Sequence, residues 1–255
     1  MSILQNVLEV TYEVRLNDIG PDSQVRNHII FDYLQDSAAR HAGILGVGMS
    51  SLRDLNIIWV LARMQLHMDR YPKSGETVLV RTYPKGLSRL FAVRHYELFN
   101  KETGDRYGYA SSFWLTLDWK TLRPLNPAQI VKEHLPKNEE KEGFFPDPGK
   151  LPQATGCGDS ISVTAAQSHI DYNDHMNNAY YVMFTQDYLA HHFQRSVFFH
   201  DIKINFNTSV KFGESFQCIG DADPETGAFT VSGILPDGRN VFTAAGIFEF
   251  KPSEK

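Results

Sequence analysis

The chain has 255 residues, enough for two domains of about 120 residues each, and its 42% hydrophobic content excludes disordered and fibrous proteins. A net charge of −5, with no basic run and no zinc-type Cys/His spacing, argues against a nucleic-acid-binding protein. No apolar stretch reaches the roughly 20 residues that cross a bilayer, and residues 1–14 alternate like a strand instead of a signal peptide, so we expect a cytoplasmic protein without a membrane span.

The first half of the chain begins with a strand that ends near Arg15 and continues into a helix at about 28–45. Asn27 is a candidate N-cap of this helix and Gly46 a candidate stop. The residues that recur at helical spacing are Ile29, Ile30, Tyr33, Leu34, Ala38, His41 and Leu45. Strand patterns follow at 59–70, 76–84, 90–100 and 106–118, and the sequence KETGD marks the turn between the last two. This half predicts a long helix followed by an antiparallel meander.

The second half repeats this order of elements after a polar, proline-containing stretch. An aromatic-rich helix is expected at 179–193, and its strands are expected at 202–210, 214–220, 228–236 and 240–250. A short echo, SGET at 74–77 against FGES at 212–215, supports a duplication. A long helix against a curved antiparallel sheet is the hot-dog arrangement, so we predict an α+β fold of two fused hot-dog domains. The predicted boundaries are an N-terminal domain at 1–125, a linker at 126–154 and a C-terminal domain at 155–255.

Residues suited to proton transfer gather immediately before the second helix. Asp171, Asn173 and His175 alternate there, and an extended backbone would point all three side chains the same way. Asn177 and Asn178 can cap the helix, whose free N–H groups and positive dipole end would stabilise an oxyanion. Hydrolysis of an activated carbonyl needs a base, an orienting donor and such N–H groups. Taken singly, each of these residues also fits an ordinary capping loop.

Several motifs are similar to those of a known family over nearly the whole chain. They are YLQDSAARHAGILGVG, WVLARMQLHMDRYPKSGETV, RLFAVRHYELFNKETGDRYGYASSFWLTLD with RPLNP after it, and IDYNDHMNNAYYV. In these motifs the chain resembles the acyl-acyl carrier protein thioesterases of bacteria and plants. The resemblance implies hydrolysis of a fatty acyl thioester carried by acyl carrier protein, with Asp171, Asn173 and His175 as the catalytic residues of the C-terminal domain.

One position departs from the family pattern. The family usually carries an acidic residue, followed in plant members by a cysteine, in the strand after this helix. Ser209 and Val210 stand at these positions, so neither that carboxylate nor a thiol nucleophile is present. We therefore expect Asp171 and His175 to act on a bound water that Ser209 helps to hold. Cys157 and Cys218 lie elsewhere; two cysteines suggest neither a disulfide framework nor a metal site, and we expect no cofactor.

The resemblance also implies that the acyl chain enters the first domain. Gln35 and Trp59 are the candidates for the cavity wall, although both could be core residues. Docking of an acidic carrier protein would need a basic patch, for which the candidates are Lys85, Arg89 and Arg94, or Lys203 and Lys211. An acyl-coenzyme A thioesterase and a non-catalytic acyl-binding protein are the alternatives, and a homodimer is a further hypothesis.

Overall fold

The computed structural model describes residues 6–21, 23–136, 138, 140–141, 143–156 and 158–250. The chain divides into two compact units. Unit 1 comprises Met1–Val25 and Asp32–Asp147, and unit 2 comprises Arg26–Phe31 and Pro148–Lys255. None of the helices formed by the described residues has the length and hydropathy needed to cross a membrane.

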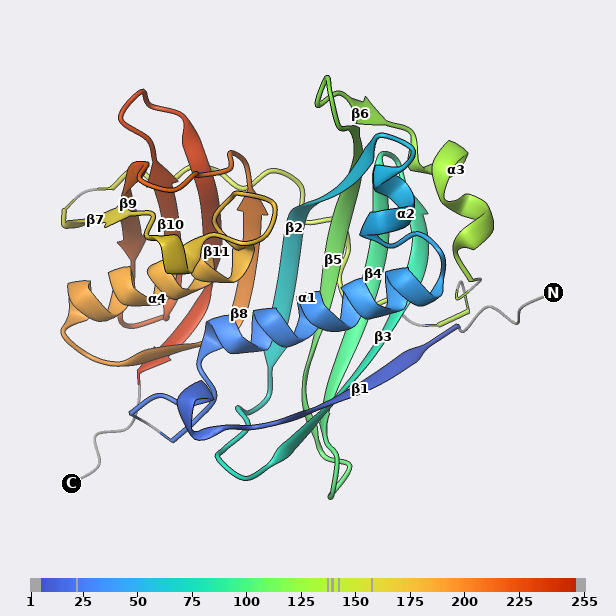
Figure 1. Ribbon diagram of the computed structural model, residues 1–255. Coiled ribbons are helices and arrows are strands. Elements are labelled where there is room, and N and C mark those ends of the chain that lie inside the picture. Colours follow the sequence, from blue (N-terminus) through green and yellow to red (C-terminus); the bar gives the residue numbers. More distant parts are fainter. Residues whose placement is uncertain are drawn as a thin grey trace. The chain divides into compact units, whose positions relative to one another are not determined.

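Unit 1 is an antiparallel sheet with most of a long helix, α1, against it, while residues 27–31 of α1 belong to unit 2 (Figure 1). Its strands lie in the order β1-β3-β4-β5-β2, and β6 pairs with β5. The helix α1 contacts this sheet through the His41 Nδ1 atom, 3.0 Å from Arg94 of β4, and through Asp36, which accepts a hydrogen bond from Tyr12 of β1. The elements are β1 Leu8–Glu13, η1 Leu16–Asp18, α1 Asn27–Ile44, α2 Met49–Arg53, β2 Ile57–Met68, β3 Thr77–Ser88, β4 Phe91–Asn100, β5 Arg106–Asp118, β6 Pro124–Leu125, α3 Pro127–Ile130 and η2 Lys132–His134.

Unit 2 has the same plan. Its strands lie in the order β8-β11-β10-β9-β7, and its helix α4 contacts all five of them. If the strands of each unit are numbered in chain order, both sheets have the spatial order first, third, fourth, fifth, second. In both units the long helix comes between the first and second strands in the sequence. The elements are β7 Ser160–Thr164, η3 Gln167–His169, α4 Asn178–Phe193, β8 Val197–Phe206, β9 Ser215–Ala222, β10 Ala228–Ile234 and β11 Asn240–Phe250.

The ends of α1 follow from backbone geometry. Gly46 has a φ of 74°, a left-handed conformation that favours glycine. Its N–H donates to the Gly43 carbonyl and the Val47 N–H donates to the Ala42 carbonyl, which closes the helix in a Schellman motif. The predicted stop at Gly46 is therefore confirmed. The predicted cap is displaced by one residue, because Asn27 is already the first residue of the helix.

Most predicted strands match the structure to within two residues. Two differ more: β3, expected at 76–84, continues to Ser88, and β8, expected at 202–210, spans Val197–Phe206. Val197 and Phe199 are buried and pair with β11, so the strand begins earlier than its alternation suggested. After Phe206, the N–H groups of Asn207 and Thr208 both donate to the Val241 carbonyl, which ends the regular ladder. Residues 207–210 therefore form a loop.

Hydrogen bonds show that the duplication extends to individual turns. The loops 19–25 and 170–176 are both closed by an antiparallel bridge between their end residues and contain a left-handed residue, Ser23 with φ 60° and Asp174 with φ 63°. In the first loop the Gly20 N–H donates to the Gln24 carbonyl at 2.8 Å, and in the second the Asp171 N–H donates to the His175 carbonyl at 2.8 Å. The loop ends are anchored alike, by Val25 N–H on the Pro72 carbonyl at 2.9 Å and by Met176 N–H on the Val210 carbonyl at 2.8 Å.

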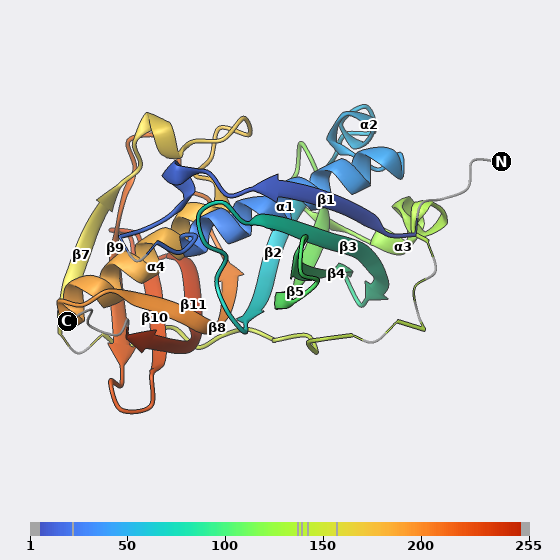
Figure 2. The same cartoon turned by 90° about the horizontal axis from the view of Figure 1, so that it is seen from below.

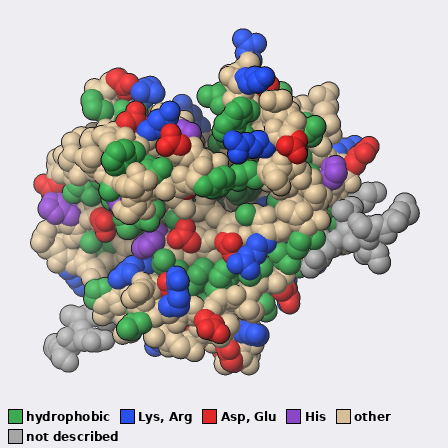
Figure 3. All heavy atoms as spheres, viewed as in Figure 1, with side chains coloured by type: hydrophobic (Ala, Val, Ile, Leu, Met, Phe, Trp, Pro, Cys, Tyr) green, Lys and Arg blue, Asp and Glu red, His purple; other side chains and the backbone are tan. Residues whose placement is uncertain are grey.

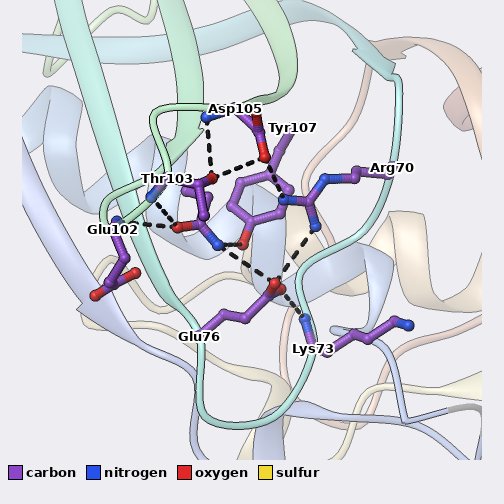
Figure 4. A network of polar contacts seen from close by, with 8 residues as sticks. Arg70, Lys73, Glu76, Glu102, Thr103, Asp105 and Tyr107 are labelled. Carbon is purple, nitrogen blue, oxygen red and sulfur yellow. Dashed lines mark hydrogen bonds and ion pairs between the residues drawn. The ribbon is translucent and has the colours of Figure 1, made fainter.

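The echo between SGET and FGES is also structural. A carboxylate oxygen of Glu76 accepts from the Lys73 N–H at 2.7 Å, and Glu214 accepts from the Lys211 N–H at 2.8 Å. In unit 1 this turn is tied to the β4–β5 turn by further contacts (Figure 4). Arg70 and Asn100 both reach Glu76, and Asn100 also donates to the Tyr107 hydroxyl and accepts from the N–H groups of Glu102 and Thr103. Burial alone would raise the pKa of the Glu76 carboxyl, but hydrogen bonds from the Lys73 N–H, Tyr107 and Arg70, together with the Arg70 charge, lower it.

The stretch predicted as a linker, 126–154, contains α3 and η2, and its residues 143–147 run along the face of the unit 1 sheet opposite α1 (Figure 2). Asp147 pairs with Arg63 there, and the rings of Phe144 and Phe145 pack on Tyr109. Beneath this stretch His95 is buried, and its Nδ1 lies 2.5 Å from the Ser111 hydroxyl. The first part of the stretch is therefore packed against unit 1.

Candidate functional site

The loop 170–176 in unit 2 holds the three predicted catalytic residues, but its backbone is not extended. The Asp171 N–H donates to the His175 carbonyl, and the Asp174 N–H donates to the Asp171 carbonyl at 3.1 Å. With Asp174 in the left-handed region, these bonds form a tight turn. The expectation that an extended backbone aligns the three side chains is therefore wrong.

The turn brings two of the three side chains together. The Asp171 carboxylate accepts from the Asn173 N–H at 2.8 Å and lies 3.5 Å from the Asn173 amide nitrogen. Asp171 and His175 are half-buried and Asn173 is exposed. In the part of the chain that the structure describes, the His175 imidazole makes no hydrogen bond with Asp171. The imidazole is thus held on the loop without being locked to the carboxylate.

The N-terminus of α4 follows directly. Asn177 is its N-cap, since its side chain accepts from the Ala179 N–H at 2.9 Å, as predicted for a capping residue. The Asn177 N–H itself donates to the His169 carbonyl at 2.9 Å and is therefore already used. The Asn178 N–H, at the first helical residue, finds no acceptor among the described residues. Of the two predicted oxyanion donors, Asn178 is the one with an available N–H.

Ser209 lies in the loop after β8, not in a strand, and its side chain is exposed. Its neighbour Val210 is buried and accepts the Met176 N–H, which places this loop beside the end of 170–176. Cys218 is buried in β9, and burial, together with the charge of Asp187, raises the pKa of its thiol far above the ordinary value. A thiol of this kind is a poor nucleophile. Cys157 lies outside the described residues.

The two predicted cavity residues lie in unit 1. Trp59, at the start of β2, donates from Nε1 to the Val47 carbonyl at 2.9 Å and packs against a buried cluster that includes Leu45 and Val131. Trp59 itself is half-buried. Gln35 is half-buried on α1.

One of the predicted basic residues is not at the surface. Arg94 is only 7% exposed and bonds to His41 and Thr82, so its proposed place in a docking patch is wrong. Arg89, Lys203 and Lys211 are exposed. On the face shown in Figure 3, Lys and Arg side chains alternate with Asp and Glu.

The chain is similar to known proteins over most of its length. Two family models match the chain, the acyl-ACP thioesterase N-terminal domain over residues 5–135 and the acyl-ACP thioesterase C-terminal domain over residues 159–245. A chloroplastic palmitoyl-acyl carrier protein thioesterase of Gossypium hirsutum is 28% identical over 187 residues, which cover 69% of this chain and 45% of that protein. One from Cuphea hookeriana is 30% identical over 199 residues, covering 71% and 47%. The chain thus spans less than half the length of these curated relatives.

Solved structures show the same fold. An acyl-ACP thioesterase from Bacteroides thetaiotaomicron has a TM-score of 0.83 at 22% identity, covering 96% of this chain and 98% of that one. The 12:0-ACP thioesterase from Umbellularia californica has a TM-score of 0.78 at 18% identity, covering 98% and 96%. The predicted α+β class with two hot-dog domains is confirmed. The chain belongs to the acyl-ACP thioesterase family.

Proposed function

We propose that this chain hydrolyses the thioester of a fatty acyl group on acyl carrier protein and releases the free fatty acid. One observation carries the proposal: in a chain of this family, Asp171, Asn173 and His175 lie on one tight loop next to the capped N-terminus of α4. The curated relatives named above are thioesterases for acyl carrier protein substrates, which supports the same substrate class here.

The proposed reaction uses water as the nucleophile. His175 takes a proton from the water as its oxygen attacks the thioester carbonyl carbon, and the Asn178 N–H meets the resulting oxyanion. The C–S bond then breaks, the thiol leaves with the proton from His175, and the fatty acid is released. Asn173 holds the Asp171 carboxylate in place beside this water, and the Ser209 hydroxyl helps to hold the water. No acyl-enzyme forms, because Val210 stands at the position where plant members of the family carry a cysteine.

The proposal also covers where the acyl chain and the carrier protein bind. We place the acyl chain in unit 1, with Gln35 and Trp59 as candidate wall residues, and the carrier protein on exposed basic residues such as Lys211. Charge reversal at Lys211 should raise the Michaelis constant for the carrier-linked substrate and leave small thioester analogues unaffected.

The decisive experiment compares steady-state release of fatty acid from acyl-acyl carrier protein and from acyl-coenzyme A, with a His175→Ala variant as control. We expect faster turnover of the carrier-linked substrate and its loss in the variant. Preference for coenzyme A would reassign the donor. Binding of acyl groups without release would establish the non-catalytic alternative, and a covalent acyl adduct found by mass spectrometry would exclude direct attack by water.

A further inference from the structure

A pocket that the proposed reaction does not use lies on the face of the unit 1 sheet opposite α1. Its volume is about 270 Å³, and all of its lining residues belong to unit 1. Two neighbouring strands contribute to its floor, because Val93 of β4 pairs with Phe113 of β5, and His95 lies two residues further along β4 on the same face. The complete lining consists of Lys85, Gly86, Leu87, Ser88, Val93, His95, Phe113, Gly143, Phe145 and Asp147.

The cation of this pocket is placed by a β-bulge in β3. Pro84 pairs with Arg94 and Gly86 pairs with Val93, so Lys85 is the extra residue of the bulge. A bulge changes the direction of the side chain that it carries. The Lys85 ammonium is half-buried and donates to the Asn138 carbonyl at 3.0 Å. An ammonium group carries three N–H donors, so it can keep this bond and donate to the oxygen of a ligand as well.

The charges around the pocket favour an anion. Asp147 forms an ion pair with Arg63, so these two charges offset each other. His95 is 2% exposed, and burial together with the Lys85 charge lowers the pKa of its imidazole to about 4, which leaves it neutral at pH 7. Taken together, these described groups carry a net positive charge that belongs to Lys85.

The other walls of the pocket are apolar and close together. Phe145 packs on Tyr109 with the ring centroids 5.3 Å apart, which holds the segment 143–147 against the sheet. Within this segment, a Cβ added to Gly143 would lie 3.3 Å from the His95 Nε2 atom and 3.8 Å from the Lys85 Cε atom. A side chain at position 143 would therefore narrow the pocket between its cation and its imidazole.

We propose that this pocket binds a medium-chain fatty acid, with its carboxylate on the Lys85 ammonium and its hydrocarbon chain against the apolar lining. That lining is formed by Leu87, Val93, Phe113 and Phe145. A charge-assisted hydrogen bond and the burial of apolar surface both stabilise such a complex. The volume lies just below the roughly 300 Å³ at which sites for drug-sized ligands begin, which limits the bound chain. The choice of a fatty acid rests on the proposed function, because that reaction releases this class of molecule.

The test is an NMR titration of the full chain with octanoate at pH 7, followed at the ring protons of His95. Loss of these signals in His95→Asn identifies them, and we expect them to shift saturably. Acetate lacks the chain and octanol lacks the charge, so each should bind about tenfold or more weakly than octanoate. Because His95 lies in the pocket, octanoate bound elsewhere on the chain would not produce this dependence on both parts of the ligand.

Two variants and a control assign the contacts. Lys85→Met removes the charge and should lower the affinity for octanoate about tenfold while leaving that for octanol unchanged. Gly143→Ala keeps every charge and should lower the affinity for both probes by narrowing the pocket. The matched control is Lys120→Met, which removes an exposed lysine of the same unit and should bind octanoate as the wild type does.

Several results would overturn the proposal. They are the absence of a saturable shift at His95, equal affinities for octanol and octanoate, and an unchanged octanoate affinity in both Lys85→Met and Gly143→Ala. A loss in Lys120→Met as large as that in Lys85→Met would do the same, because it would indicate attraction by the overall charge. The titration requires no turnover. A chain that binds octanoate in this way but releases no fatty acid from acyl-acyl carrier protein would refute the proposed function and leave the pocket assigned.

Discussion

His95 should make unit 1 sensitive to mild acid. Burial lowers the pKa of its imidazole to about 4, with a further contribution from the charge of Lys85. In the unfolded chain the pKa returns to about 6.5, so a fall in pH protonates the unfolded state first and favours it. One pKa unit corresponds to about 1.36 kcal/mol, so the difference between the two pKa values contributes at most about 3 kcal/mol to the free energy of unfolding. About 2 kcal/mol of this contribution is lost between pH 8 and pH 5.

The assay is urea unfolding of the wild type and of His95→Asn at these two pH values. All three tryptophans, Trp59, Trp114 and Trp119, lie in unit 1, so their fluorescence reports this unit. The variant should be less stable at pH 8 but should lose about 2 kcal/mol less than the wild type on going to pH 5. Replacing the exposed His134 by Gln is the control and should preserve the wild-type difference. Equal pH dependence in the wild type and His95→Asn would refute the reasoning.

Three further outcomes are expected. His175→Ala should lower kcat on the order of a hundredfold or more and Asn173→Ala less, as measured by fatty acid release. Gly46→Ala should lower the free energy of unfolding by about 1 kcal/mol, because a Cβ is strained at φ 74°, and urea titration would show this. In a Cys157→Ser variant, Cys218 should react with a thiol reagent only upon unfolding, because it is buried and its pKa is raised. Rapid labelling of the native protein would contradict its burial.

Much of the fold could be predicted from local patterns. β5 and β11 lie at 106–118 and 240–250 as expected, since their strands are long, alternate clearly and are bounded by turn residues. The start of β8 at Val197 was missed because burial on that strand is set by pairing with β11, a contact distant in sequence. Pairing of this kind has no local signal.

The candidate site was harder to predict than the fold. Asp171, Asn173 and His175 were predicted from their spacing and from the family motif, and their role stays a prediction. The turn that orients them depends on the left-handed Asp174 and on the anchor from Val210.

The repeated loop has an evolutionary consequence. Its shape in both halves comes from main-chain hydrogen bonds and one left-handed residue, and unit 1 keeps that shape with Gly20 and Gln24 in place of an acid and an imidazole. After a gene duplication, one copy could therefore lose its reactive side chains by drift without losing its fold. Under the proposed function, that copy would be free to be selected for another task, while unit 2 kept the side chains of the proposed reaction. A tandem chain of this kind separates the evolution of specificity from that of catalysis.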